Sequence, residues 1–158
     1  MKTIAIGSDE AGFELKETII RFLNEKNIAV TDYGVFDTKP VLYPDIAVKV
    51  AQTIADGEHD RGILICGTGI GMAIAANKVP GIRAAVCHDP YSAERARKSN
   101  DAQIMALGAR IVGAELAKFL VATWLESEFQ GGGSASKVAR ITEYENMFFH
   151  QKGFNSNS

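Results

Sequence analysis

The sequence has few of the residues that mark metal-binding, disulfide-linked or nucleic-acid-binding proteins. It contains two cysteines, Cys66 and Cys87, and no CxxC pair. Its three histidines lack the spacing of metal ligands, so we expect no structural or catalytic metal. The formal net charge is only −2, and no basic cluster favours nucleic acid or an acidic membrane surface.

Long hydrophobic runs are also missing, so we expect no membrane-spanning helix. The segment Met1–Gly7 has a single lysine and leads directly into a strand pattern, which is unlike a signal peptide. We therefore expect a cytoplasmic protein in which both cysteines are reduced. With 46% hydrophobic residues, the chain should form one domain over residues 1–150, followed by a C-terminal tail over residues 151–158.

Apolar runs typical of strands alternate with helical patterns along the chain. Strands are expected at residues 3–6, 28–33, 62–65, 82–86 and 103–107, and helices at residues 13–26, 45–57, 71–78, 91–98, 113–128 and 136–147. Asp45 is expected to cap the second helix. The apolar end Met147–Phe149 would either pack within the chain or contact another subunit.

The strands are continuous apolar runs, which is typical of a parallel sheet buried on both faces. The predicted fold class is a Rossmann-like three-layer α/β/α sandwich with a five-stranded parallel sheet. Ligands of such sheets bind at the carboxyl ends of the strands. The segments expected at that edge are Asp9, Glu10, Cys66–Gly71, Cys87–Asp89 and Gly108–Arg110.

The stretch Gly62–Ala73 combines a buried strand, a glycine-rich turn and the start of a helix. A phosphate-binding P-loop would need Lys and then Ser or Thr where this chain has Met72 and Ala73. A dinucleotide-binding turn would follow the first strand and would have a glycine at Met72. Both interpretations are therefore disfavoured.

A third interpretation is an anion hole beside a base. Converging N–H groups of Gly67–Gly71 would bind an oxyanion, and their field would lower the pKa of the Cys66 thiol. A thiolate beside such a hole suits proton abstraction next to a carbonyl. The alternative is that Cys66 is a small buried hydrophobe, and its spacing leaves both interpretations open. For Cys87 we favour the buried hydrophobe.

Several motifs, spread over nearly the whole chain, resemble those of type B ribose-5-phosphate isomerases, a family that includes galactose-6-phosphate isomerase. They are Gly7-Ser8-Asp9, Gly12-Phe13-Glu14-Leu15-Lys16, Tyr43-Pro44-Asp45, Cys66-Gly67-Thr68-Gly69-Ile70-Gly71, Asn100-Asp101 and Gly108-Ala109-Arg110. The resemblance implies an aldose–ketose isomerase that interconverts D-ribose 5-phosphate and D-ribulose 5-phosphate without a metal or cofactor. It also implies a homodimer, or a dimer of dimers, whose active sites are shared between subunits.

The same resemblance implies roles for individual residues. Cys66 would move a proton between C1 and C2 of the open-chain sugar, and Thr68 would support proton exchange between the oxygens. The backbone groups that would stabilise the enediolate belong to Gly67, Gly69, Ile70 and Gly71. Further contacts to the substrate would come from Asp9, Tyr43 and Asn100.

The chain departs from the family pattern where the substrate would bind. Glu10 and Ser99 stand where the family has histidines, and the histidine at the Ser99 position opens the furanose ring in the ribose enzymes. Gly133 and Lys137 replace two arginines that help to hold the phosphate. We still expect substrate contacts from Glu10, Ser99, Arg110 and Lys137.

These departures leave other substrates open. The terminal oxygen of a tetrulose 4-phosphate, such as erythrulose 4-phosphate, is phosphorylated, so this sugar cannot close a five-membered ring and needs no ring-opening histidine. An unphosphorylated sugar is a third candidate, because the Glu10 carboxylate would repel a phosphate dianion unless it turns outward. The alternative from another class is a non-catalytic sugar-phosphate-binding subunit.

Overall fold

A parallel sheet with helices on both faces forms the body of the molecule. The computed structural model describes residues 3–155. The elements are β1 (Ile4–Ser8), α1 (Phe13–Glu25), β2 (Val30–Asp32), α2 (Tyr43–Ala55), β3 (Gly62–Cys66), α3 (Ile70–Ala76), β4 (Ala84–Val86), α4 (Pro90–Lys98), β5 (Ile104–Gly108), α5 (Ala114–Glu126), the short 3₁₀ helix η1 (Gly132–Ser134) and α6 (Ala135–Asn155). The five strands are all parallel, in the order β2-β1-β3-β5-β4. This confirms the predicted fold class.

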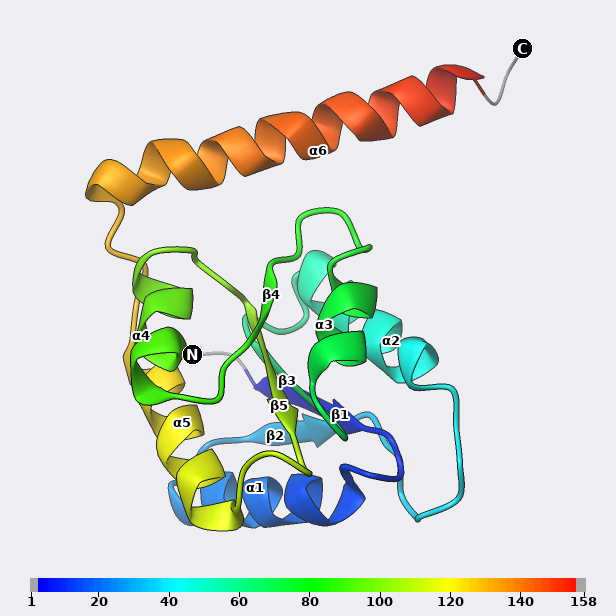
Figure 1. The fold of residues 1–158 in the computed structure, drawn as a ribbon, viewed down its shortest axis with the longest axis vertical. Coiled ribbons are helices and arrows are strands. Elements are labelled where there is room, and N and C mark those ends of the chain that lie inside the picture. The colour runs from blue at the N-terminus through cyan, green and yellow to red at the C-terminus, as the bar shows by residue number, and fades with distance from the viewer. Residues whose placement is uncertain (1–2, 156–158) are drawn as a thin grey trace.

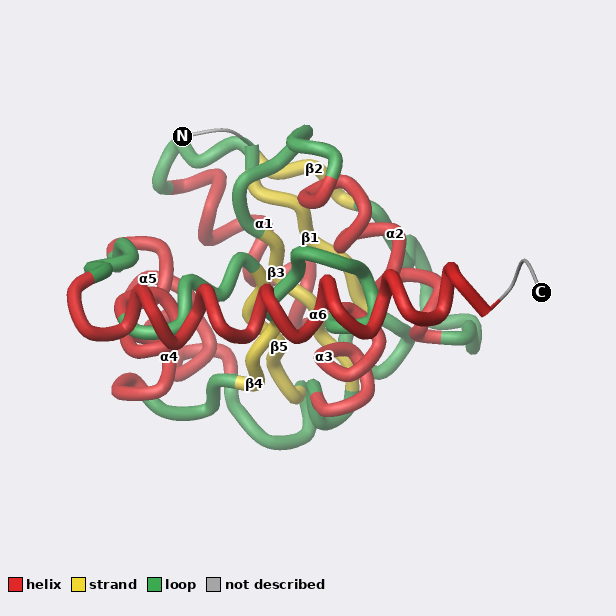
Figure 2. The backbone as a smooth tube through the Cα atoms, turned by 90° about the horizontal axis from the view of Figure 1, so that it is seen from above, coloured by secondary structure: helices red, strands yellow, loops and turns green. Residues whose placement is uncertain are grey.

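Helices cover both faces of the sheet (Figures 1 and 2). A separate hydrophobic core lies on each face. Because side chains alternate along a strand, Ile63 and Ile65 belong to one core, and Leu64 and Cys66 belong to the other. Helices α1, α4 and α5 close the first core around the fully buried Trp124. Helices α2 and α3 close the second. The Cys66 side chain therefore faces the α2 and α3 layer.

The order of the strands reverses between β1 and β3. From β1 the chain passes to β2 on one side, and then crosses through α2 to β3 on the other side of β1. The connections that follow β1 and β3 diverge at such a point, which opens a crevice at the carboxyl ends of the strands. Asp9 and Cys66 lie there, and the Asp9 N–H donates to the Ile65 carbonyl oxygen at 3.2 Å.

The structure corrects several predicted boundaries. The last helix was expected to end at residue 147 but runs to Asn155, and the strand expected over residues 28–33 is limited to Val30–Asp32. Helix α2 begins at Tyr43 with Leu42 as its N-cap, so Asp45 lies in the first turn and does not cap the helix. Proline suits the first turn, where its missing N–H would have no helical acceptor, and Pro44 therefore does not delay the helix. Strand β4 begins at Ala84, because the N–H of Arg83 donates to the Gln103 side chain at 2.7 Å.

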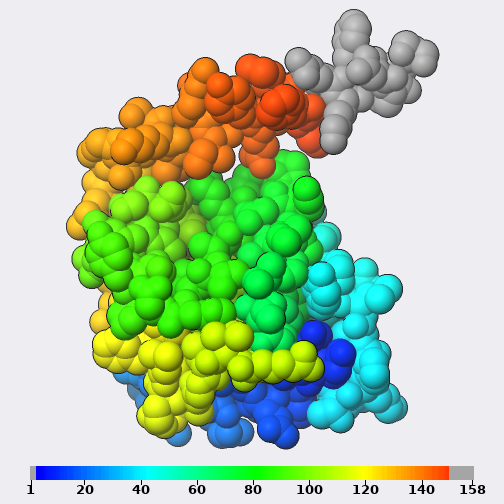
Figure 3. Space-filling model, in the orientation of Figure 1, coloured from blue at the N-terminus to red at the C-terminus, as the bar shows by residue number. Residues whose placement is uncertain are grey.

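Helix α6 lies along one end of the molecule (Figures 1 and 3). Of its side chains up to residue 149, only Val138 is buried, while Met147, Phe148 and Phe149 are between 46% and 62% exposed. Packing within the chain therefore does not cover this apolar end. The tail predicted over residues 151–158 begins within α6, and residues 156–158 lie outside the described part. None of the described helices combines the length and apolar character needed to cross a bilayer.

Candidate active site

The thiol of Cys66 is held in a tight glycine turn at the end of β3. The side chain is only 5% exposed, and its Sγ accepts the Gly69 N–H at 3.1 Å. A donor at this distance stabilises negative charge on the sulfur. Gly69 has a φ of +78°, and a Cβ there would lie 3.0 Å from the Leu107 backbone. Only glycine brings this N–H to the thiol without strain.

Two hydroxyl groups flank the same turn. Thr68 is exposed, and its Oγ1 accepts the Ile70 N–H at 3.3 Å. Tyr43 reaches the turn from the start of α2. Its phenol ring lies so close to Gly71 that a methyl group on that glycine would collide with it. The first N–H groups of α3 have no acceptor within the helix. A thiol, two hydroxyls and backbone donors thus meet at one edge of the sheet.

Charged groups of both signs lie beside this turn. Asp9 is 8% exposed, and its Oδ1 accepts the Gly12 N–H at 3.0 Å. Burial raises the pKa of the Asp9 carboxyl above its ordinary value, against the opposing effect of the Gly12 N–H. The Arg110 guanidinium covers Gly67, where a Cβ would lie 3.0 Å from its Nη1. Since Arg110 is exposed, it can meet an anionic substrate.

His88 also lies at this edge. The sequence predicted its place after the fourth strand but not which residue it contacts. Its Nε2 accepts the N–H of Gly108, the residue paired with Cys66 across β3 and β5, at 2.9 Å. The neutral ring therefore has its proton on Nδ1. Burial lowers the pKa of His88, which favours this neutral form, although the nearby Asp89 acts in the opposite direction.

The Glu10 side chain reaches the segment that precedes α2. Its Oε2 accepts the Val41 N–H at 3.1 Å. Most predicted site residues thus lie at the carboxyl edge of the sheet or in the segment beside it. They are Asp9, Glu10, Tyr43, Arg110 and the Cys66–Gly71 turn.

Three predicted site residues lie away from this carboxyl edge within one chain. They are Ser99, Asn100 and Lys137. Ser99 caps the carboxyl end of α4, and the carbonyl oxygen of Asn100 accepts Arg83 Nε at 3.0 Å, just before β4 and β5 begin. Cys66 lies at the other end of β3, and a five-residue strand spans about 13 Å. Lys137 is exposed on α6, which packs near the same amino edge through a Glu145–Gly81 hydrogen bond of 2.9 Å.

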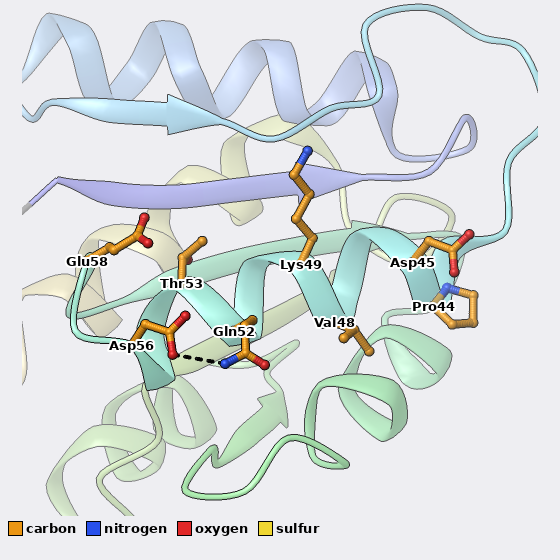
Figure 4. A pocket seen from close by; sticks show the side chains of 8 residues that line it. All are labelled: Pro44, Asp45, Val48, Lys49, Gln52, Thr53, Asp56 and Glu58. Atoms are coloured by element: carbon orange, nitrogen blue, oxygen red, sulfur yellow. Dashed lines mark hydrogen bonds between the residues drawn. The ribbon is translucent and has the colours of Figure 1, made fainter.

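A surface hollow along α2 is a separate feature (Figure 4). Its lining residues are Pro44, Asp45, Val48, Lys49, Gln52, Thr53, Asp56 and Glu58. Among the side chains drawn, Gln52 donates to Asp56 at 3.0 Å, and the others do not converge on one point. The lining includes no predicted site residue, so this hollow is not the candidate active site.

Known proteins resemble the chain over nearly its whole length. A family model described as Ribose/Galactose Isomerase matches residues 4–141. The D-erythrulose-4-phosphate isomerase of Pectobacterium atrosepticum is 58% identical over 96% of this chain and 100% of its own. The Ribose-5-P isomerase B of Listeria innocua is 61% identical over 90% of this chain and 96% of its own. The solved structure of Clostridium thermocellum Ribose-5-Phosphate Isomerase B has a TM-score of 0.91 at 53% identity, covering 94% and 99% of the two chains.

We predict that Asp9→Asn stabilises the fold at neutral pH. The substitution keeps an acceptor for Gly12 but removes a charge that burial disfavours. The raised pKa means that the folded state binds the Asp9 proton more tightly than the unfolded state does. The wild-type protein therefore gains stability as the pH falls through the folded pKa towards 3.8, the ordinary pKa of an aspartate. Thermal unfolding between pH 7 and pH 4 should show the advantage of the variant shrinking with falling pH.

The matched control for this prediction is Glu14→Gln, which removes an exposed carboxylate from the first turn of α1. It should give no comparable gain. Equal melting temperatures for Asp9→Asn and the wild type at every pH would contradict the prediction.

Proposed function

Because the chain belongs to the ribose/galactose isomerase family, we propose that it interconverts D-ribose 5-phosphate and D-ribulose 5-phosphate with Cys66 as the base. Its relatives are sugar phosphate isomerases, and the chain is accordingly an aldose–ketose isomerase. The observation that supports Cys66 most directly is the hydrogen bond from Gly69 to its sulfur at the crevice between β1 and β3. Both cysteines are free thiols, which is consistent with the predicted cytoplasmic location.

In the proposed mechanism the Cys66 thiolate removes the proton from C2 of the open-chain aldose. The electron pair moves through the new C1–C2 double bond to the carbonyl oxygen, which becomes an enediolate oxygen. The N–H groups of Gly69 and Ile70 already donate to Cys66 Sγ and Thr68 Oγ1, so the N–H groups of Gly67 and Gly71 would receive this oxygen. A proton then passes from O2 to O1 with the help of Thr68, and the Cys66 thiol returns its proton to C1.

Cys66→Ala should lower kcat by a factor on the order of 10³ or more, because general base catalysis and its positioning are lost together. Initial rates and circular dichroism of the purified variant would test this. The matched control is Cys87→Ala, since burial raises the pKa of Cys87 to about 12 and leaves it without a thiolate near neutral pH.

Near-normal turnover by Cys66→Ala would refute the assignment of the base. Incorporation of solvent deuterium into the sugar separates an isomerase from a non-catalytic binding protein, because a binding protein exchanges no C–H proton.

Ser99 favours a second candidate substrate, a tetrulose 4-phosphate. A serine hydroxyl cannot replace imidazole as an acid–base group near neutral pH, so a substrate that never cyclises fits this chain well. The full-length similarity to a protein named D-erythrulose-4-phosphate isomerase points the same way. Arg110 would contact the phosphate of either substrate.

We expect Ser99→His to improve kcat/KM for ribose 5-phosphate more than for erythrulose 4-phosphate. Only the pentose requires ring opening, so only its turnover should gain from an imidazole at this position. Initial rates of both proteins on both substrates provide the measurement. Equal effects on the two substrates would rule out ring opening as the reason for the difference.

A second copy of the chain would complete the site and explain why Asn100 lies far from Cys66. One face of α3 carries Ile70 and Ile74, which are 55% and 58% exposed. The helix ends at Ala76, and Asn77 is its C-cap. Asn77 and Asn100 line the same groove at the amino edge. If two α3 helices pack antiparallel about a two-fold axis, the Asn100 end of each chain lies against the Cys66 turn of the other. We therefore propose a homodimer with shared sites.

Mixing two inactive variants, Cys66→Ala and Asn100→Ala, should restore about a quarter of the wild-type rate. About half of the reassembled dimers are then mixed, and one of the two sites in each has both residues intact. The experiment needs co-refolding of equal amounts, followed by initial-rate assays. If activity does not return although mixed dimers form, each site is built from a single chain.

A further inference from the structure

The segment between β2 and α2 is exposed and has few attachments. Phe36 and Leu42 are each 73% exposed, and Val41 is 40% exposed. Within the described chain, residues 36–41 make one hydrogen bond among themselves, between Lys39 and Asp37, and one to another element, between Val41 and Glu10. A segment with so few contacts opens at low free energy unless its ends are held.

Its amino end is held by the buried Lys16. The Lys16 Nζ lies 2.6 Å from Asp32 Oδ2 and 5.7 Å from the centroid of the Phe36 ring. The other oxygen of Asp32 accepts the Gly34 N–H at 2.8 Å. The start of the segment is therefore anchored on α1 and β2 by an ion pair whose lysine is fully buried.

At its carboxyl end the segment continues into α2, and Glu10 is the one side chain among the described residues that forms a hydrogen bond with the backbone just before that helix. Glu10 Oε2 accepts the Val41 N–H at 3.1 Å, two residues before Tyr43. Tyr43 is 37% exposed, and its phenol ring lies directly over Gly71 in the first turn of α3. The Glu10–Val41 hydrogen bond thus connects the turn after β1 to the backbone two residues before Tyr43, which brings a hydroxyl to the candidate site.

We infer that Glu10 is a positioning residue, which fastens Val41 and so keeps the Tyr43 hydroxyl over the first turn of α3. This inference rests on the proposed isomerase function, in which that turn receives the enediolate. Glu10 acts as a hydrogen-bond acceptor and not through its charge. When the hydrogen bond opens, Tyr43 leaves the turn, and apparent substrate affinity falls in proportion to the closed fraction.

The kinetic test compares Glu10→Ala with Glu10→Gln. Alanine removes the acceptor and should raise KM about three- to tenfold with kcat within about twofold, the range expected for one exposed hydrogen bond. Glutamine keeps an acceptor oxygen and should stay within about twofold of the wild-type KM. Glu14→Ala, which removes an exposed carboxylate from α1, is the matched control. If both Glu10 variants change KM equally, the charge of Glu10 matters and the inference is wrong.

A double variant tests whether Glu10 acts through Tyr43. In a Tyr43→Phe background, the further change Glu10→Ala should alter KM by less than about twofold, because the hydroxyl that Glu10 positions is already absent. An undiminished effect of Glu10→Ala in that background would overturn the inference.

Amide hydrogen exchange of Val41 provides a readout without substrate. Glu10→Ala should speed exchange at Val41 at least severalfold, while Glu10→Gln and Glu14→Ala should leave it near the wild-type rate. Unchanged exchange in Glu10→Ala would show that the hydrogen bond does not hold the segment. If the protein turned over no sugar phosphate at all, the proposed function would fail, yet this exchange experiment would still decide whether Glu10 holds Val41.

Discussion

The close approach of three backbones at the carboxyl ends of β1, β3 and β5 determines where the Cys66 thiol lies. A Cβ on Gly12 would lie 2.6 Å from the carbonyl oxygen of Ile65, and one on Gly108 would lie 2.8 Å from the Thr68 backbone. A Cβ on Gly69 would likewise lie 3.0 Å from the Leu107 backbone. Glycine is required where backbones come this close. These contacts place the Gly69 N–H on the sulfur and expose the Thr68 hydroxyl.

The electrostatics of the site follow from the same crowding. Asp9 is buried because the β1 turn packs on β3, and its carboxyl is harder to ionise for that reason. Arg110 stays exposed at the end of β5 and provides positive charge near the glycine turn. One carboxylate oxygen of Glu10 accepts the backbone N–H of Val41. This arrangement suits an anionic substrate.

Much of the fold was predictable because short continuous apolar runs that alternate with helical patterns are typical of a parallel sheet covered on both faces. The strand that ends at Cys66 and the glycine turn after it could be read directly from Gly62–Gly71. Two local details were not predictable. Helix α2 begins at Tyr43 without a side-chain cap, which leaves Asp45 inside its first turn, and the Gln103 side chain accepts the Arg83 N–H, just before β4 begins. The His88 bond to Gly108 likewise depends on β4 and β5 being neighbours.

The amino-acid order therefore establishes the parallel sheet, the layers around it and the turn that holds Cys66, since each depends on contacts between residues close in sequence or on a repeating pattern. The same pattern places Ser99 and Asn100 before β5 and Arg110 after it, and so at opposite edges of a parallel sheet. Only the tertiary structure decided which side chains from other elements approach the turn: the Tyr43 ring lies over Gly71, and the Arg110 guanidinium lies over Gly67. These contacts join residues far apart in the sequence, so no local pattern could show them.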